Sequence, residues 1–305
     1  VGILLRRASD PHKDLMIAAI GPFWDANETW LVLGVGLLMV AFPLAHGVIL
    51  TALYLPVALM LLGLCLRGVA FKFRSKAAPE HKAGWNQAFW AGSLIATLAQ
   101  GYMLGSMVLG FASGWAAFAF ASLIAVCLVA GYCLLGAGWL IFKTTGALQQ
   151  QALRWAKASL GWTALGIAAV SLATPFASER IFDKWFSLPW LVLLAPIPLM
   201  TLLLFYLIWR SLARLPTRLQ LGNEYGTAVP FAATVGIFLL AFYGLAYSLF
   251  PYLVMDRMTL WQAAASPEAL WLIFLGACVM LPIIVASSLF VYRVFGGKAQ
   301  VADYT

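Results

Sequence analysis

The stretch PFWDANETWLVLG, residues 22–34, places three polar side chains at the start of a strongly apolar segment. Asp25 and Glu28 are carboxylates, and Asn27 lies between them. Residues three apart in a helix lie on one face, so the two carboxylates would form a polar stripe. A charge at the centre of a membrane helix costs about 2.5–3.5 kcal/mol, so the meaning of the stripe depends on whether this segment crosses a bilayer.

The composition answers that question for the whole chain. Of its 305 residues, 63% are hydrophobic and 10% are charged, whereas soluble domains carry about 25% charged residues. The net charge of +8 comes from short basic clusters between long apolar segments, a pattern typical of membrane orientation and not of nucleic-acid binding. The sequence therefore predicts a single integral membrane domain over residues 1–305.

A membrane-spanning helix needs about 20 apolar residues, and that length fits the chain eight times. The alternating strands of a membrane β-barrel are absent from the pattern, so we expect an all-α polytopic membrane helix bundle. Val1 to Leu5 and the following Arg6 and Arg7 are interpreted as the tail of a missing first helix, which makes the chain N-terminally truncated and gives nine helices in all. The eight complete spans are expected at residues 24–44, 47–66, 89–109, 115–142, 160–176, 188–209, 229–249 and 269–292.

The basic residues test this topology, because cytoplasmic loops carry an excess of Lys and Arg. With helices that alternate in direction, all but Arg180, Lys184 and Arg257 of the 19 basic residues fall on one side. The expected orientation has the C-terminus in the cytoplasm.

Metal or haem ligation has little support in the sequence. The four cysteines lie in apolar segments without CxxC spacing, which is typical of structural thiols. His12, His46 and His81 lie in or beside loops, where solvated or interfacial side chains are the simpler interpretation. We therefore expect no metal site in this chain.

The position of Asp25 leaves two interpretations open. Counted from an outer turn near Ala45, Asp25 and Arg67 are each some 20 residues away, about 30 Å along a helix, so they should meet at the cytoplasmic boundary. In the first interpretation they form an ion pair that fixes two antiparallel helices. In the second, Arg67 keeps Asp25 ionised at a proton entrance, Glu28 carries the proton inward, and Asn27 orients either carboxylate.

The polar stretch and its surroundings resemble subunit II of the cytochrome bd-type ubiquinol oxidases, with the cyanide-insensitive branch as a candidate. The resemblance rests on a specific motif core, while the remaining two-thirds of the chain match mainly in helix number, loop length and charge bias. The motif residues are Asp25, Asn27, Glu28, Trp30, Phe42, Pro43, Arg67, Gly68, Val69, Phe73, Arg74, Ser75 and Lys76.

The resemblance implies a fold of nine helices, arranged as two four-helix bundles and a peripheral helix, in the bacterial cytoplasmic (inner) membrane. It also implies an activity of the whole complex: quinol oxidation coupled to reduction of O₂ to water, which generates a proton motive force. Two b-type haems and one d-type haem would be held by the partner, subunit I. This chain alone would then be haem-free and not catalytic, with a structural quinone as a possible ligand and a small single-helix subunit as a possible further partner.

The same resemblance assigns roles to individual residues. Asp25 would lie on a proton route, Trp30 near an apolar oxygen route, and Arg67 would help to hold the partner's haem site in shape. The expected function is therefore to scaffold subunit I and to contribute a cytoplasmic proton intake path. Two alternatives remain: a stand-alone proton-coupled secondary transporter, and a purely structural partner with no proton role.

Overall fold

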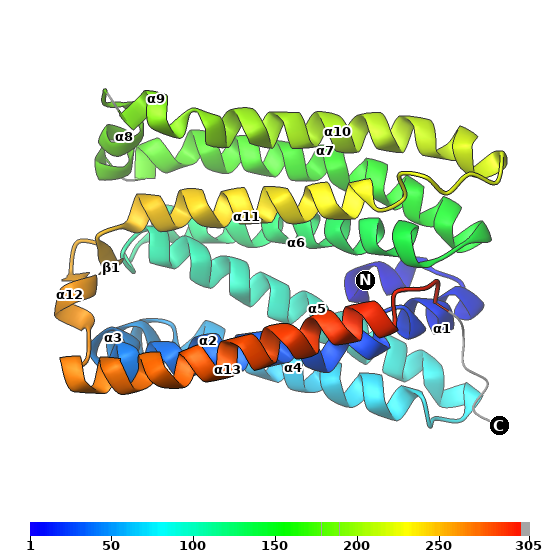
Figure 1. Ribbon diagram of the computed structural model, residues 1–305, viewed down its shortest axis with the longest axis horizontal. Helices are drawn as coiled ribbons and strands as arrows, with labels where there is room; N and C mark the ends of the chain where they lie inside the picture. The colour runs from blue at the N-terminus through cyan, green and yellow to red at the C-terminus, as the bar shows by residue number, and fades with distance from the viewer. Residues whose placement is uncertain (178, 189, 300–305) are drawn as a thin grey trace.

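The computed structural model describes residues 1–177, 179–188 and 190–299, without the side chains of residues 25–28, 175–177, 179 and 190. Within these ranges eight helices have 18 residues or more, and each overlaps one of the expected spans (Figure 1). They are α2 (Trp24–Ala41), α4 (Tyr54–Arg74), α5 (Pro79–Val108), α6 (Trp115–Lys143), α7 (Gly146–Ala177), α10 (Pro196–Gln220), α11 (Val229–Leu249) and α13 (Pro267–Val294).

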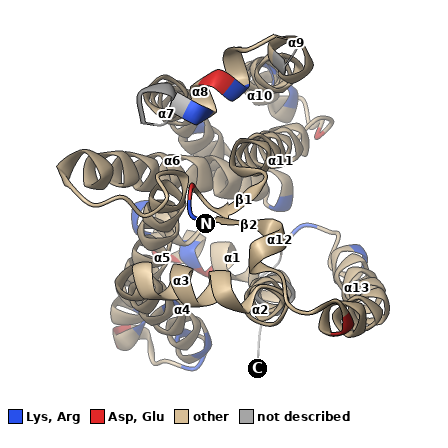
Figure 2. Cartoon of the chain, turned by 90° about the vertical axis from the view of Figure 1, so that its left-hand side faces the viewer, with Lys and Arg blue, Asp and Glu red and all other residues tan. Residues whose placement is uncertain are grey.

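The long helices form two groups (Figures 1 and 2). In one, α6 packs against α7 and α11, and α10 packs against α7 and α11. In the other, α4 packs along α5 and α13 packs against α2. The contact between α5 and α6 joins the two groups.

Short elements close the two ends of the bundle. The 3-10 helix η1 (Gly2–Arg7) packs against α5 and α6, and α1 (Asp10–Ala18) and η2 (Gly21–Phe23) lead from it into α2. At the other end (left in Figure 1) lie α3, α8, α9, α12 and the antiparallel pair β1 and β2. Their bounds are Pro43–Ala52, Glu179–Phe186, Trp190–Leu194, Leu260–Ala263, Tyr252–Val254 and Met258–Thr259.

The eight membrane crossings expected from the sequence are not confirmed by helix length and apolarity. In the described ranges six helices are long and apolar enough to cross a membrane, or up to seven if the pair Thr29–Ala41 and Pro43–Ala52, bent by 117°, is one span. The helix α5 is not among the six because polar and small residues such as Ser93, Gln100 and Tyr102 interrupt its apolar sequence. The molecule is thus a multi-pass helical membrane protein.

Helix boundaries differ from the expected ones where the chain bends. The expected span 24–44 ends early, because Phe42 leaves the helical conformation before Pro43, which cannot continue the hydrogen bonding of α2. The expected span 47–66 is divided at Leu53, between α3 and α4. The long straight helix of this region is therefore α4.

The helices α4 and α5 approach each other closely through glycine. A Cβ atom on Gly92 would lie 2.6 Å from the carbonyl oxygen of Gly63 and 2.8 Å from the amide nitrogen of Arg67. Small residues allow such backbone contact between membrane helices. This contact fixes the height of Arg67 against α5.

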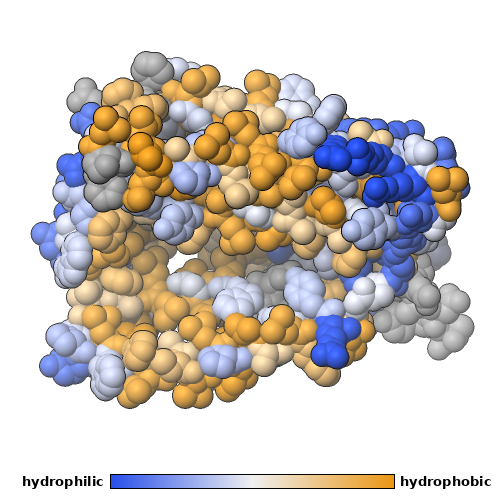
Figure 3. Space-filling model, turned by 45° about the horizontal axis from the view of Figure 1, so that its top comes forward, coloured by the Kyte–Doolittle hydropathy of each residue, from blue (hydrophilic) through white to orange (hydrophobic). Residues whose placement is uncertain are grey.

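The outer surface of the molecule suits a bilayer. Apolar side chains cover the middle of the molecule and hydrophilic side chains gather toward its two ends (Figure 3). The ends of α4, α6, α10 and α13 and the starts of α5 and α7 lie together at one end (right in Figure 1). The basic clusters of these segments therefore share that end, which we call the basic end.

Candidate functional site

The start of α2 is fixed against α4 and α5 by aromatic and cationic contacts. The ring of Trp24 stacks on Phe71 with centroids 4.9 Å apart and lies 5.9 Å from the ring of Phe89. The guanidinium of Arg67 lies 4.4 Å from the centroid of the same Trp24 ring. Cation–π contacts of this kind contribute about 0.5–2 kcal/mol.

Phe23, one residue earlier, fixes the same point from the other side. Its ring lies 5.0 Å from that of Trp139 on α6 and 4.8 Å from that of Tyr292 on α13. The indole nitrogen of Trp139 donates to the carbonyl oxygen of Ala19 at 2.9 Å. The beginning of α2 is therefore held between four other long helices, α4, α5, α6 and α13.

The predicted proton-path residues Asp25, Asn27 and Glu28 belong to the first turn and a half of α2. Their side chains lie outside the described residues, so the ion pair between Asp25 and Arg67 stays a prediction. The structure does place Trp24, the residue directly before Asp25, in contact with Arg67. The start of α2 and Arg67 thus lie side by side.

Trp30 lies farther along α2, on its outer surface. Its side chain is 39% exposed, and the neighbouring Leu31 and Val32 are also exposed. An exposed apolar strip on a membrane helix faces either lipid or another protein. The structure therefore leaves Trp30 accessible to a neighbouring molecule.

Polar groups inside the bundle serve helix packing. Ser93 and Thr97 are buried, and each hydroxyl donates to a carbonyl oxygen one turn earlier in α5, at 2.8 Å. The hydroxyl of Tyr132 on α6 donates to the amide oxygen of Gln100 on α5 at 3.0 Å. These polar groups of α5 therefore bond within the helix or to its neighbour α6.

A charged network at the basic end was not predicted from the sequence. The guanidinium of Arg74 is almost fully buried, lies 2.7 Å from the carboxylate of Asp14 and donates to the side chain of Asn86. Lys82 lies 4.0 Å from the same carboxylate. The network joins α1, α4 and α5, and its signals in the sequence were an Arg at the end of an apolar segment and the place of Arg74 in the family motif.

A second missed cluster ties the C-terminal segment to α6. Lys143 is 3% exposed, and its ammonium donates to the carbonyl oxygens of Phe295 and of Gly297, the latter at 3.0 Å. Lys298, in the C-terminal segment, donates to the carbonyl oxygens of Phe142 and Thr144 at the end of α6, at 3.0 and 3.2 Å. The two lysines thus bond the C-terminal segment to the end of α6 from both sides of the contact.

The three histidines lie in the short helices α1 and α3 and in the first turn of α5. His12, in α1, is hydrogen bonded to the side chain of Gln151 at 3.1 Å. His46 lies in the short helix α3, and His81 is exposed in the first turn of α5. Among the described residues no group of three His, Cys, Asp or Glu side chains could hold a metal ion.

Residues 1–295 match the family model of cytochrome bd terminal oxidase subunit II. The chain belongs to this family. A relative from Bacillus subtilis, cytochrome bd ubiquinol oxidase subunit 2, is 26% identical over 309 aligned positions, which cover 93% of this chain and 84% of the relative. Cytochrome bd-I ubiquinol oxidase subunit 2 of Escherichia coli K12 is 31% identical over a shorter region of 113 positions, 36% of this chain and 30% of that protein.

The fold agrees with that assignment. A chain of the solved bd oxidase from Geobacillus thermodenitrificans superposes with a TM-score of 0.73 over 92% of this chain and 86% of the other, at 18% identity. The subunit is therefore part of a quinol oxidase complex, an oxidoreductase that contains haem and a partner subunit I. The alternative of a stand-alone transporter is not favoured.

Proposed function

We propose that this subunit is haem-free, that it holds the haem-bearing subunit I in place, and that it supplies a cytoplasmic proton intake path through Asp25, Asn27 and Glu28. The observation that carries the proposal is the fixed start of α2, where Trp24 packs between Phe71 and Arg67. The packing of Trp24 fixes the start of the helix that carries the carboxylates, and proton transfer over short distances requires groups on such a fixed backbone.

The placement of the histidines supports the haem-free role. A haem between packed helices needs an axial ligand that points into the bundle. His12 is bonded to Gln151 at the basic end, and His81 is exposed there. In this proposal the b-type and d-type haems belong to subunit I, which performs quinol oxidation and O₂ reduction.

The scaffolding role is supported by unpaired apolar surface on α2 and α13. Among the described residues none of α13 is buried, although the helix has 28 residues, and its main contacts are with α2 and η2. Large side chains such as Trp271 and Phe274 are exposed along it. We assign this surface, together with the exposed face of α2, to contact with subunit I.

The chemistry of the start of α2 supports proton intake. The N-terminus of a helix and a nearby guanidinium both stabilise an ionised carboxylate, so Arg67 would keep Asp25 as an acceptor at the basic end. Glu28 lies one turn farther along α2 and would accept the proton next. We place this end in the cytoplasm because it carries most of the Lys and Arg.

Trp30 completes the proposal. It lies about half a turn beyond Glu28 on the helix and is exposed beside Leu31 and Val32. An apolar strip of this kind would line a route for O₂ where subunit I covers it. Arg67, which contacts Trp24, would help to hold the partner's haem site in shape.

The proton path can be tested by sidedness. In vesicles that contain the oxidase and a trapped pH dye, a membrane-impermeant reagent that labels the lysines of the basic end shows which side this end faces. Protons should be taken up from that side, and Glu28→Gln should slow their uptake. Glu268→Gln, in the first turn of α13 at the opposite end, is the control. Normal uptake by Glu28→Gln would contradict the proposed path.

The haem-free role has a separate test. This subunit produced alone should purify without haem absorption, whereas production with subunit I should yield one complex with b- and d-type bands. Haem bound to the lone subunit would overturn this part of the proposal.

A further inference from the structure

The helices α7 and α10 together form a strongly basic pair. Between residues 146 and 177 and between residues 196 and 220 they contain no Asp or Glu. They carry five basic residues toward the basic end: Arg154, Lys157, Arg210, Arg214 and Arg218. Among the described residues the first four make no ion pair, and all four are exposed. An anionic partner would complement the charge of this surface.

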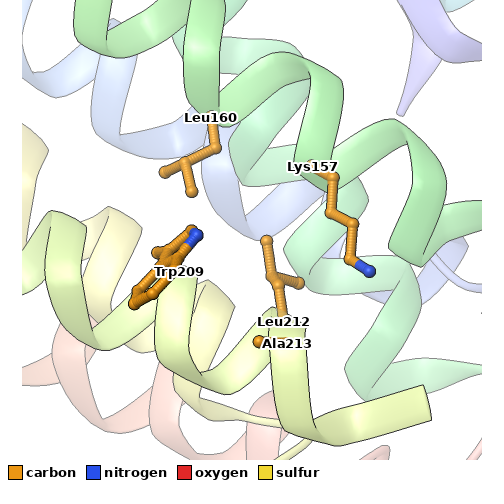
Figure 4. Close-up of a pocket in the computed structure, with 5 residues that line it drawn as sticks. All are labelled: Lys157, Leu160, Trp209, Leu212 and Ala213. Carbon is orange, nitrogen blue, oxygen red and sulfur yellow. The ribbon is translucent and has the colours of Figure 1, made fainter.

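A groove opens between the two helices beside these charges (Figure 4). It has a volume of about 320 Å³ and is lined by Lys157 and Leu160 from α7 and by Trp209, Leu212 and Ala213 from α10. Leu160 and Leu212 are buried and form its floor, whereas Trp209 is 61% exposed and forms a wall. The volume is at the lower end of the range for ligand sites, about 300–1,000 Å³.

The groove has a polar and an apolar end. Lys157 lies one turn closer to the basic end than Leu160 on the same helix (Figure 4). In the opposite direction along α10 lie exposed Leu203 and Tyr206, and the ring of Tyr206 is 6.0 Å from that of Trp209. An occupant would therefore place a negative group at Lys157 and an apolar chain toward the middle of the helices.

We infer that this groove binds an anionic glycerophospholipid from the bilayer, with its phosphate at Lys157 and the start of one acyl chain between Leu160, Trp209 and Leu212. Basic pockets between membrane helices bind such headgroups, and Trp is enriched at the level of the headgroups. A small soluble anion would satisfy Lys157 but would leave the apolar walls without a partner. A phospholipid satisfies both ends of the groove in one molecule.

This inference does not depend on the proton path, because it involves neither α2 nor α4. The assigned headgroup contact is an ammonium–phosphate contact at Lys157, supported by the exposed guanidinium groups of Arg154, Arg210 and Arg214. Each such basic residue strengthens the binding of an anionic lipid about fivefold. Loss of Lys157 should therefore be measurable by itself.

The test is native mass spectrometry of the intact, delipidated oxidase complex titrated with dioleoyl phosphatidylglycerol. Lys157→Gln should weaken binding of one lipid about fivefold, and Trp209→Ala should weaken it without a change in charge. Lys76→Gln is the matched control, since Lys76 is exposed in the α4–α5 connection at the same end. The haem spectrum of each variant confirms that the complex has assembled.

Several results would overturn the inference. If Lys157→Gln binds the lipid as tightly as the wild type, Lys157 does not contact the headgroup. If Trp209→Ala binds the lipid as tightly as the wild type, the lipid is held by surface charge and not by the groove. Equal affinity for dioleoyl phosphatidylcholine contradicts the requirement for a net negative lipid. Displacement of the lipid by millimolar inorganic phosphate would indicate a site for a soluble anion.

Discussion

The guanidinium of Arg67 lies 4.4 Å from the ring centroid of Trp24, the residue directly before Asp25. This contact joins a residue two-thirds of the way along α4 to the first residue of α2. The polar stretch that opens α2 is thereby placed against a helix that begins 30 residues later, at Tyr54.

The Trp24–Arg67 contact should be measurable as a coupling energy. Trp24→Leu, Arg67→Gln and the double variant form a cycle in which the double variant loses about 0.5–2 kcal/mol less than the sum of the singles. The apparent free energy of unfolding of the purified complex in detergent provides the measurement. Strict additivity of the two substitutions would mean that the contact contributes nothing.

The Arg74–Asp14 pair should be more important than a neighbouring exposed pair. Arg74 is 5% exposed and Asp14 lies 2.7 Å from its guanidinium, so Asp14→Asn leaves a buried charge with less compensation. Because Asp14 is about a third exposed, we expect a loss of about 1–3 kcal/mol, less than for a fully buried pair.

Asp10→Asn is the control for that prediction. Asp10 is exposed, and Lys13 beside it, at 2.7 Å, holds the pKa of its carboxyl below the ordinary value. Water screens such a pair, so thermal unfolding should not change. Equal losses for Asp10→Asn and Asp14→Asn would contradict the assignment of a buried network.

The glycine contact between α4 and α5 predicts intolerance of a single methyl group. In Gly92→Ala the new Cβ would meet backbone atoms of Gly63 and Arg67 at 2.6 and 2.8 Å, and neither can move independently of α4. We expect a loss of about 1–3 kcal/mol in stability and lower turnover, because Arg67 shifts with the helix.

Gly84→Ala, in the same helix, is the matched control. A Cβ at Gly84 has no neighbour within 4 Å, and Ala is a better helix former than Gly. The control should keep or slightly raise the unfolding temperature. If both variants unfold alike, the close approach of the helices is not the cause.

The C-terminal segment should depend on Lys143. Besides the two carbonyl bonds from its ammonium, the carbonyl oxygen of Lys143 accepts from the amide of Ala299 at 2.7 Å. Lys143→Met should therefore release this segment, seen as faster amide hydrogen exchange across residues 295–299. Unchanged exchange there would show that the bonds of Lys298 to Phe142 and Thr144 suffice.

The helices could be predicted because apolar length and basic loops are local properties of the sequence. Their bends were harder to predict, although both follow from proline: Pro43 begins α3, and Pro56, in the first turn of α4, lacks the amide that a continuous helix would bond to Ala52. The expected span 47–66 nevertheless ran through Pro56. Polar residues in α5 make that helix less apolar than a typical membrane-spanning segment of about 20 apolar residues. The expected eight crossings therefore became six or seven by length and apolarity.

The site could be predicted only in part. The stretch around Asp25 was identified by its residue types and by its resemblance to a family, and the family is confirmed by the match over residues 1–295. The networks of Arg74 and Lys143 were missed because their partners are far away in the chain. Asn86 and Asp14 are ordinary polar residues in the sequence and acquire a role only when α1, α4 and α5 come together.

The central claim, proton intake through Asp25, is tested most directly by the turnover of an assembled Asp25→Asn oxidase. The amide keeps the shape of the side chain but cannot take up a proton, so we predict that quinol-driven O₂ consumption falls at least tenfold while the b- and d-type haem bands keep their wild-type intensity. Asp10→Asn, also at the basic end, should consume O₂ at the wild-type rate. Wild-type O₂ consumption by Asp25→Asn with full haem content would contradict the account.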